Sequence, residues 1–362
     1  MKIALLGDIA FFGRFSLESN KHLHQYFEEV AKKLRSYDLV IGNLETPFAQ
    51  PHHKSFGYKS AYIKSSPVNV ELLKYLNISV VNLANNHIYD YGPDSYQFTK
   101  MILEENGIRY FGIEKQELLI ETKDNTISLN GYCCYSTNPL GIDSQNKKGI
   151  NALSVPAVTE RLTHNSAKGY FNIFSVHCGQ EHVNYPNYDH IELARDLAKI
   201  GPYVFYGHHP HVLQGIEKID ESLIAYSLGN FCFDDVYTSK SKEPLIKQSQ
   251  NNKESAILEI TVEKNKLVEH DIIPITIGTD SLQIGDKKIL DKIDQYSAML
   301  KSEKELYIHN RNSLLGRYLA SRKKLRNLNW YIQRLNHRSA GLILFARRNA
   351  KEYRRNISRY LK

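Results

Sequence analysis

The sequence predicts an α/β fold, because short apolar runs and amphipathic segments alternate along much of its 362 residues. Six runs share one design, in which an apolar, often β-branched stretch ends in small and polar residues. Near-continuous apolar runs of this length are typical of strands that are buried on both faces. The six predicted strands lie within residues 2–8, 37–45, 78–87, 170–179, 203–211 and 223–231.

Helices are predicted between several of these strands. Residues 22–34 carry a single apolar stripe at helical spacing, formed by Leu23, Phe27, Val30 and Leu34. Residues 92–107 begin with Pro93 at a position that favours helix initiation. Residues 189–201 begin with Asp189, which we expect to act as an N-cap.

The chain changes character after the sixth predicted strand. Residues 234–255 are polar and are predicted to form a long exposed loop. Residues 256–277 contain two strand-like runs about a polar turn. This pattern predicts a hairpin that closes the sheet.

Charge divides the chain into two parts. The net charge is +8, but residues 311–362 contain 15 Lys and Arg and one Glu, a net of +14, which leaves −6 on the rest. The basic part also carries an apolar seam, interrupted by Ser321 and Ser339, that predicts an amphipathic helix. The seam comprises Leu314, Tyr318, Leu325, Leu328, Ile332, Leu335 and Leu342.

Side chains that can bind metal follow five of the six predicted strands. In open α/β sheets ligands bind just beyond the carboxyl ends of the strands, so we expect these side chains to converge. Carboxylate, amide and imidazole ligands without thiolates suit divalent Mn, Fe or Zn. The candidates are Asp8, Asn43, Glu45, Asn85, Asn86, His87, His177, Glu181, His208, His209 and His211.

Each candidate also has an ordinary structural explanation. Asp8 and Glu45 are typical of turns or caps, and the "NNH" of residues 85–87 is compatible with a turn. His177 alone is more often a hydrogen-bonded core histidine, whereas "GHHPH" at residues 207–211 already favours metal. Because five strand ends carry such residues together, the set favours one shared site.

The chain contains, in order, the motifs Gly7-Asp8, "GNLE", "ANNHIYDYG", "VHCGQEH", "GHHPHV" and "YSLGNF". Together these six motifs resemble the bacterial capsule synthesis family CapA, within the calcineurin-like metallophosphoesterase superfamily. The resemblance spans residues 1–277 and implies a metallophosphoesterase-like layered α/β/β/α sandwich. Residues 278–362 are then a helical, strongly basic C-terminal extension outside that domain. The family is linked to poly-γ-glutamate and related capsular polymers.

The resemblance implies a role for most of the candidate residues. Asp8, Asn86 and His177 match metal ligands, and Glu45 takes the place of a metal-bridging Asp. His87 matches the general acid. The segment "GHHPH" offers either His208 with His211 or His209 with His211 as further ligands.

Two departures from the superfamily pattern leave the number of ions open at one or two. Ala10 stands where the superfamily has a ligating His, and Ile88 stands where an acidic residue normally follows the Asn-His pair. Asp90 is the nearest acidic replacement. We therefore expect Asp90 and Glu181 to assist His87 in catalysis.

Two functions are compatible with this set of residues. In a metal-dependent hydrolase the ions lower the pKa of a bound water, while His87 protonates the leaving group of a phosphoester or anionic polymer. The alternative is a non-catalytic accessory subunit of a membrane polymer synthase that binds the anionic polymer. The retained His87 favours the enzyme, and Ala10 favours the accessory subunit.

The basic tail is predicted to contact an anionic membrane surface or a synthase partner. A helical hairpin packed on the body is the structural alternative, and nucleic acid is disfavoured because no recognised binding module accompanies the charge. The sequence shows no signal peptide and no apolar stretch of roughly 20 residues. We therefore expect a cytoplasmic protein that is peripheral at the inner face of the cell membrane.

Overall fold

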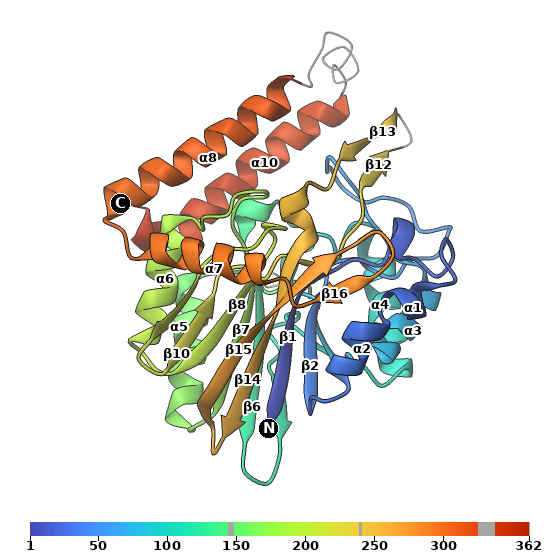
Figure 1. The fold of residues 1–362 in the computed structure, drawn as a ribbon. Helices are drawn as coiled ribbons and strands as arrows, with labels where there is room; N and C mark the ends of the chain where they lie inside the picture. The colour runs from blue at the N-terminus through green and yellow to red at the C-terminus, as the bar shows by residue number, and fades with distance from the viewer. Residues whose placement is uncertain (144–147, 239–240, 325–336, 362) are drawn as a thin grey trace.

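A computed structural model describes residues 1–143, 148–238, 241–324 and 337–361, which form two large β-sheets and a small hairpin (Figure 1). In the first sheet the order is β16 (Leu282–Ile284), β15 (Lys266–Ile277), β14 (Glu254–Glu263), β1 (Lys2–Ile9), β2 (Leu39–Leu44), β3 (Val80–Asn82) and β4 (Arg109–Phe111), with β11 (Asn230–Cys232) also paired to β1. Strands β1 to β4 run parallel to one another.

In the second sheet the order is β5 (Leu118–Glu121), β6 (Thr126–Cys133), β7 (Phe171–His177), β8 (Tyr203–His208), β10 (Ser222–Ala225) and β9 (Ile216–Ile219). Its inner strands β6, β7, β8 and β10 are parallel. The small hairpin pairs β12 (Val236–Thr238) with β13 (Ser241–Ile246). Parallel strands within each sheet bring their carboxyl ends to one edge.

Helices cover the outer faces of both sheets. The first sheet packs against α1 (Leu23–Tyr26), α2 (Glu28–Leu34), α3 (Val70–Tyr75) and α4 (Gly92–Glu105). The second packs against α5 (Val155–Ala167) and α6 (Tyr188–Ala198). Short 3-10 helices lie at Gly13–Phe15, Pro67–Asn69, Tyr135–Thr137, Gln250–Lys253 and Ser358–Tyr360.

The apolar core between the two sheets explains why they stack. Ile3, Leu5 and Ile41 of the first sheet share one buried cluster with Ile173 and Val204 of the second. Strands buried on both faces lose water from every side chain, which accounts for the continuous apolar runs in the sequence. The predicted layered α/β/β/α sandwich with a helical C-terminal region is confirmed.

Several predicted elements need correction. Residues 223–231 form two strands, β10 and β11, in different sheets, because the turn between them carries the chain across the sandwich. Residues 234–255 are not one long loop, since they contain β12 and β13. The predicted helix 22–34 is split into α1 and α2 at Phe27. Asp189 lies in the first turn of α6, and the N-cap is Asn187.

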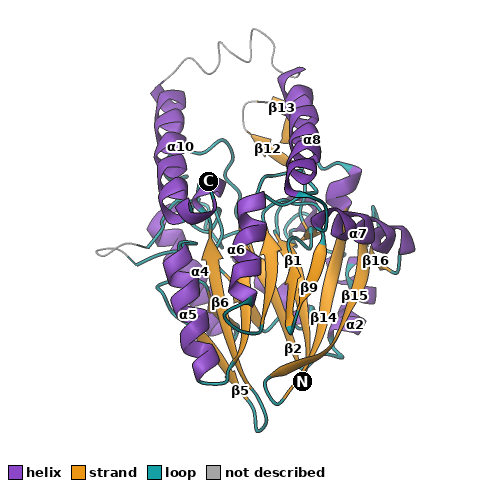
Figure 2. Ribbon diagram, turned by 90° about the vertical axis from the view of Figure 1, so that its left-hand side faces the viewer, coloured by secondary structure: helices purple, strands orange, loops and turns teal. Residues whose placement is uncertain are grey.

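The C-terminal region forms α7 (Lys287–Leu300), α8 (Lys304–Lys324) and α10 (His337–Asn356). In Figure 2, α8 and α10 rise from the end of the sandwich to which β1 and β6 point. Both helices pack on the body of the protein. Tyr307 on α8 and Ile357, which directly follows α10, are buried in the apolar cluster around α5 and α6. In addition, the Tyr353 hydroxyl donates to the Asp189 carboxylate.

The apolar seam predicted for the tail is described only in part. Leu314, Tyr318 and Leu342 lie on α8 and α10 and are half-buried, whereas Leu325, Leu328, Ile332 and Leu335 lie outside the described residues. No helix among the described residues is both long and apolar enough to cross a membrane. The domain boundary at residue 277 stays a prediction; β16, just beyond it, pairs with β15.

Candidate metal centre

Strand register brings the predicted ligands together. Asp8 on β1 lies opposite Asn43 on β2, and His177 on β7 lies opposite His208 on β8. Both pairs stand at the carboxyl ends of parallel strands, one pair in each sheet. Because the sheets are stacked, these ends meet at one edge of the sandwich, where the following loops add Glu45, Asn86 and the histidines after β8.

Glu45, His209 and His211 form the tightest group of ligands. One ligand atom from each of the three lies within 4.8 Å of the others, and all three residues are buried. His209 and His211 have backbone φ angles of +93° and +57°. Non-glycine residues adopt this left-handed region at an energetic cost, and such strain clusters at functional sites. Of the two pairings that "GHHPH" offered, this geometry favours His209 with His211.

The carboxylate of Glu45 suits a cation. It is fully buried, and within the described residues neither of its oxygens has a hydrogen-bond partner. Burial, reinforced by the neighbouring Asp8 carboxylate, raises the pKa of Glu45 well above its ordinary value. A buried carboxylate without donors is costly, and a bound metal ion removes that cost. The site therefore fits a divalent ion in its chemistry as well as its geometry.

His177 and Asn86 form a second donor group beside Glu45. The Nε2 atom of His177 lies 3.0 Å from Asn86 Oδ1 and 3.7 Å from Glu45 Oε1. The Asn86 amide donates to the Thr137 carbonyl, which turns its Oδ1 toward His177. Burial and the nearby His209 lower the pKa of His177 well below its usual value. A neutral imidazole is the form that binds metal.

Asp8 is fully buried and is contacted by residues of β2 and of the carboxyl end of β8. Asn43 donates to its Oδ1 at 2.7 Å, and the backbone N–H of His209 donates to its Oδ2 at 3.2 Å. His208 Nδ1 lies 3.2 Å from Asp8 Oδ1, close enough for charge attraction but without hydrogen-bond geometry. Although burial opposes ionisation, His208 and His211 hold the pKa of Asp8 below its ordinary value.

Ala10 contributes no ligand to this centre. It is fully buried in an apolar cluster with Phe233 and Val236. The position where the superfamily has a His is therefore part of the hydrophobic core here. Among the described residues, His208 is the imidazole nearest Asp8 from the other sheet.

The structure also reveals supporting residues that the sequence did not single out. The Asn230 amide donates to the Asn252 carbonyl at 3.1 Å, so its Oδ1 accepts from His211 Nδ1 at 2.9 Å. His211 Nδ1 thus carries the proton, and Nε2, 3.7 Å from Glu45, presents its lone pair. The only sequence signal was the "GN" of the motif "YSLGNF", at the start of β11.

His87 is oriented by a carboxylate and a lysine. Its Nδ1 lies 2.6 Å from Asp90 Oδ2, and Lys59 Nζ donates to Asp90 Oδ1 at 2.6 Å and to the Asn86 carbonyl at 2.6 Å. Because Asp90 is an acceptor, the proton of neutral His87 sits on Nδ1 and Nε2 is free to face substrate. Burial lowers the pKa of His87, and Asp90 partly offsets this. Sequence reasoning missed Lys59, which lies in a loop without any motif.

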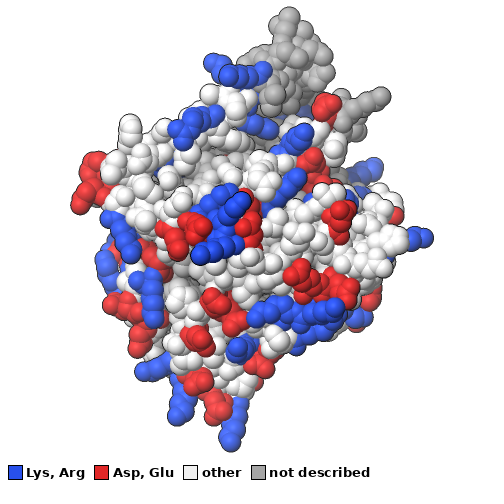
Figure 3. Space-filling view, in the orientation of Figure 1, with Lys and Arg blue, Asp and Glu red and all other residues white. Residues whose placement is uncertain are grey.

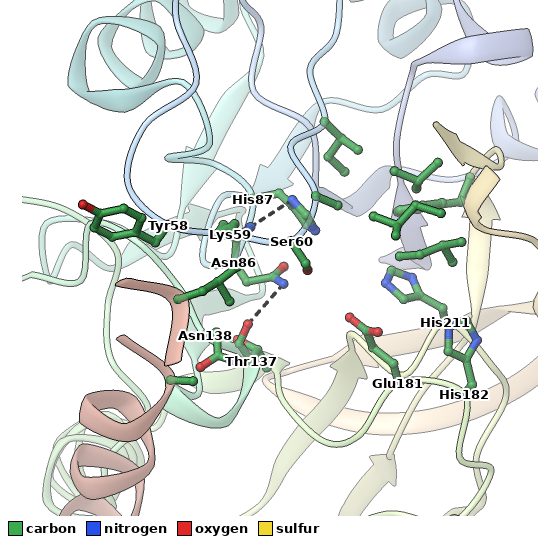
Figure 4. Close-up of a pocket in the computed structure, with 18 of the residues that line it drawn as sticks. Tyr58, Lys59, Ser60, Asn86, His87, Thr137, Asn138, Glu181, His182 and His211 are labelled. Carbon is green, nitrogen blue, oxygen red and sulfur yellow. Dashed lines mark hydrogen bonds between the residues drawn. The ribbon is translucent and has the colours of Figure 1, made fainter. Parts of the chain in front are cut away.

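Lys59, Asn86 and His87 line a pocket of about 170 Å³ beside the ligand group. Figure 4 shows Asn86 and His87 on one side of it and Glu181 and His211 on the other. Burial raises the pKa of Glu181, but surrounding histidines, led by His209, outweigh burial and hold it at about 2. Glu181 is therefore an anion at neutral pH, and it faces the ligand group.

Comparison with known proteins identifies the family. The family described as "Bacterial capsule synthesis protein PGA_cap" matches residues 2–235. The chain belongs to this family. Similar proteins include the "PGA biosynthesis protein CapA" of Bacillus subtilis (strain 168), which is 28% identical over 296 residues, covering 78% of this chain and 75% of the relative. The "Capsule biosynthesis protein CapA" of Bacillus anthracis is 26% identical over 273 residues, covering 72% and 66%.

A similar solved structure is the NAD nucleotidase of Haemophilus influenzae, with 13% identity and a TM-score of 0.42 over 90% of this chain and 60% of that one. The PGA_cap match confirms the resemblance to CapA. It contains every predicted site residue and ends before α7, α8 and α10. The roles assigned to individual residues stay predictions.

Proposed function

We propose that this PGA_cap protein is a metal-dependent hydrolase. Its substrate would be a phosphoester or a related bond in an anionic surface polymer, such as poly-γ-glutamate or a capsular polysaccharide. The observation that supports this most is His87, which Asp90 orients and which lines the same pocket as His211, a member of the group formed with Glu45 and His209. A protein that only held polymer would not need a proton donor aligned beside its ligands.

The metal would be held by Glu45, His209 and His211, with His177 and Asn86 as the donors of a second position around Glu45. Divalent Mn, Fe or Zn suits this oxygen and imidazole set. When bound, such an ion lowers the pKa of a coordinated water and polarises an anionic oxygen. Asp8 stabilises the centre through His208 and His211.

Proton transfer is assigned to His87. Asp90 accepts from Nδ1 and favours the protonated ring, and in that form, which carries a proton on both nitrogens, Nε2 can donate to the departing oxygen. Lys59 holds Asp90 in place and brings a positive charge to the pocket wall. Glu181, on the opposite side of the pocket, is an anion that can orient a nucleophilic water by accepting a hydrogen bond from it.

The test is hydrolysis by Mn-loaded protein across phosphomonoesters, phosphodiesters and poly-γ-glutamate. His87→Asn should abolish turnover and keep metal content, because His87 is assigned to proton transfer and not to ligation. His164→Asn, an exposed histidine on α5, is the matched control and should retain activity. Loss of metal with His87→Asn would contradict the assignment. Full turnover in that variant would remove His87 from the mechanism.

A second candidate is a non-catalytic subunit of a polymer synthase that binds the anionic polymer. The observation that favours it is Ala10, which is buried among apolar side chains where the superfamily has a ligand. The same hydrolysis panel separates the two candidates. Metal-loaded protein that binds poly-γ-glutamate but turns over none of the substrates would establish the accessory role.

We also propose that the C-terminal helices place the protein on an anionic membrane surface. Ile343 and Leu344 on α10 are 55% and 65% exposed, and Arg347 and Arg348 follow them one turn later. Figure 3 shows further Lys and Arg side chains over the upper part of the molecule, near α8. Exposed apolar residues flanked by cations suit the lipid headgroup region, where each Lys or Arg contributes about 1 kcal/mol.

Co-sedimentation with phosphatidylglycerol and phosphatidylcholine vesicles tests this membrane proposal. The double variant Ile343→Ser with Leu344→Ser should reduce binding to the anionic vesicles, and high salt should weaken what remains. Val268→Ser, which removes an equally exposed apolar side chain from β15, is the control. Equal sedimentation of all three proteins would show that α10 does not contact lipid.

A further inference from the structure

The pocket beside the ligand group is lined by polar and by apolar side chains. Asn86 and His87 lie on one side of it and Glu181 lies on the other (Figure 4). The apolar part of the lining, here called the apolar wall, combines residues from three parts of the chain that are distant in sequence. It comprises Ala61, Ile63, Phe233, Val236, Leu245, Ile246, Leu342, Phe345 and Ala346.

Part of the apolar wall comes from α10, outside the region that matches the family. Leu342, Phe345 and Ala346 lie at helical spacing and line the pocket, whereas Ile343 and Leu344 point to solvent. This part of α10 therefore has an inner face that lines the pocket and an outer face that is exposed to solvent, and both faces are apolar. Whatever the outer face contacts, the inner face lines the pocket that also contains His87 and His211.

The helices are held over the pocket by specific contacts with its rim. A side chain at Gly341 would meet the ring of Tyr58 at 2.8 Å, so α10 sits directly against that pocket residue. Asn349 donates to Asn138, and Arg322 of α8 donates to the Leu245 carbonyl at 3.1 Å. Tyr58, Asn138 and Leu245 all line the pocket. The C-terminal helices thus complete the pocket rather than merely lying near it.

We propose that this wall is a specificity subsite for an apolar group attached to the anionic end of the substrate. The anion faces the metal centre, with Arg322 at the rim, and the adjoining group packs on Phe345, Leu342 and Ile246. A cavity of roughly 150 Å³ holds one benzene ring, so a pocket of about 170 Å³ takes one small end group and not a length of polymer. This inference rests on the proposed function, because the metal centre places the anion.

The test compares two non-hydrolysable anions by titration calorimetry on full-length, Mn-loaded protein. Phenylphosphonate and methylphosphonate share the anionic group and differ in apolar area. The wild type should bind phenylphosphonate at least about tenfold more tightly, since the phenyl ring leaves water on the apolar wall. Inorganic phosphate should displace both ligands, because all three share the same anion position.

Substitutions in the apolar wall test whether that wall causes the preference for phenylphosphonate. Phe345→Ala should reduce the phenyl preference to about threefold or less and leave methylphosphonate binding unchanged. Leu344→Ala, its exposed neighbour on α10, should keep the full preference. Ile246→Ala tests the same wall from β13, so the result does not depend on how α10 tolerates substitution.

The outcomes separate this inference from the proposed function. Equal affinity of the wild type for the two phosphonates, or the same preference in the Phe345 and Leu344 variants, would overturn the subsite. A clear phenyl preference in a protein that hydrolyses no ester would leave the subsite standing and reject the hydrolase. Hydrolysis by a wild type that shows no phenyl preference would leave the hydrolase standing and reject the subsite.

Discussion

Replacing Glu45 by Gln tests the metal centre through protein stability. The substitution keeps the shape of the side chain and replaces its ionisable carboxyl group with a neutral amide. In the metal-free wild type the anionic form of Glu45 is disfavoured, because the carboxylate is buried beside Asp8 and has no hydrogen-bond partner among the described residues, whereas a neutral amide does not carry this electrostatic cost. Metal-free Glu45→Gln should therefore unfold at the same temperature as the wild type or a higher one.

Bound metal should make the wild type unfold at a higher temperature than Glu45→Gln. At a concentration of roughly 100 times Kd, Mn stabilises the folded wild type by about 2.7 kcal/mol. The unfolding entropy of a 362-residue chain is on the order of 0.8 kcal/mol per degree, so the midpoint should rise by about 3–4 °C. Glu45→Gln should lose most of this shift, because its amide is a poor replacement for an anionic ligand.

Glu217→Gln is the matched control for scanning calorimetry. Glu217 is a mostly buried carboxylate whose partners are Arg195 at 2.8 Å and the Tyr226 hydroxyl at 2.6 Å. Removing a partnered carboxylate should lower the metal-free midpoint and leave the Mn shift intact. The opposite sign in the two variants separates a ligand from an ordinary buried acid. A full Mn shift and full metal content in Glu45→Gln would refute the metal assignment.

Three further outcomes are expected. His177→Ala should lower metal content without unfolding the protein, measured by elemental analysis and circular dichroism, and unchanged content would remove His177 from the centre. Lys59→Met should reduce kcat with metal content unchanged, because Asp90 loses the cation that holds it; wild-type kcat would show that Lys59 has no positioning role. Burial lowers the pKa of His182 from 6.5 to about 4, so the unfolded chain takes up this proton first. Stability should therefore fall as pH is lowered from about 6.5 to about 4, and the midpoint of His182→Gln should fall less steeply than that of the wild type; identical slopes would contradict this.

Membrane binding by the C-terminal helices is tested better by a substitution than by a truncation. The sequence of residues 311–362 predicted an amphipathic helix that contacts a membrane surface, with a helical hairpin packed on the body as the alternative. In the structure α8 begins at Lys304, before the charged stretch, and Ile357 near the end of the chain is fully buried against the second sheet. Truncation would uncover this apolar surface, whereas changes at Ile343 and Leu344 leave it covered.

The sequence alone determined the fold class and the strand ends at which the site forms. An apolar run followed by Asp8 or His177 is a local pattern, because burial on both faces requires continuous apolar residues and the site requires polar ones directly after them. The alternation of strands and helices is local in the same sense. For these features the neighbouring residues along the chain carry the necessary information.

Only the tertiary structure decided which residues meet and how each is held. The choice of His209 with His211, the proton on His211 fixed by Asn230, and the support of Asp90 by Lys59 all depend on contacts between distant segments. The same holds for Phe345, which lines the pocket together with residues that are far from it in the sequence, such as His87. Such contacts follow from the stacking of two sheets and the return of the C-terminal helices, and no local pattern encodes that geometry.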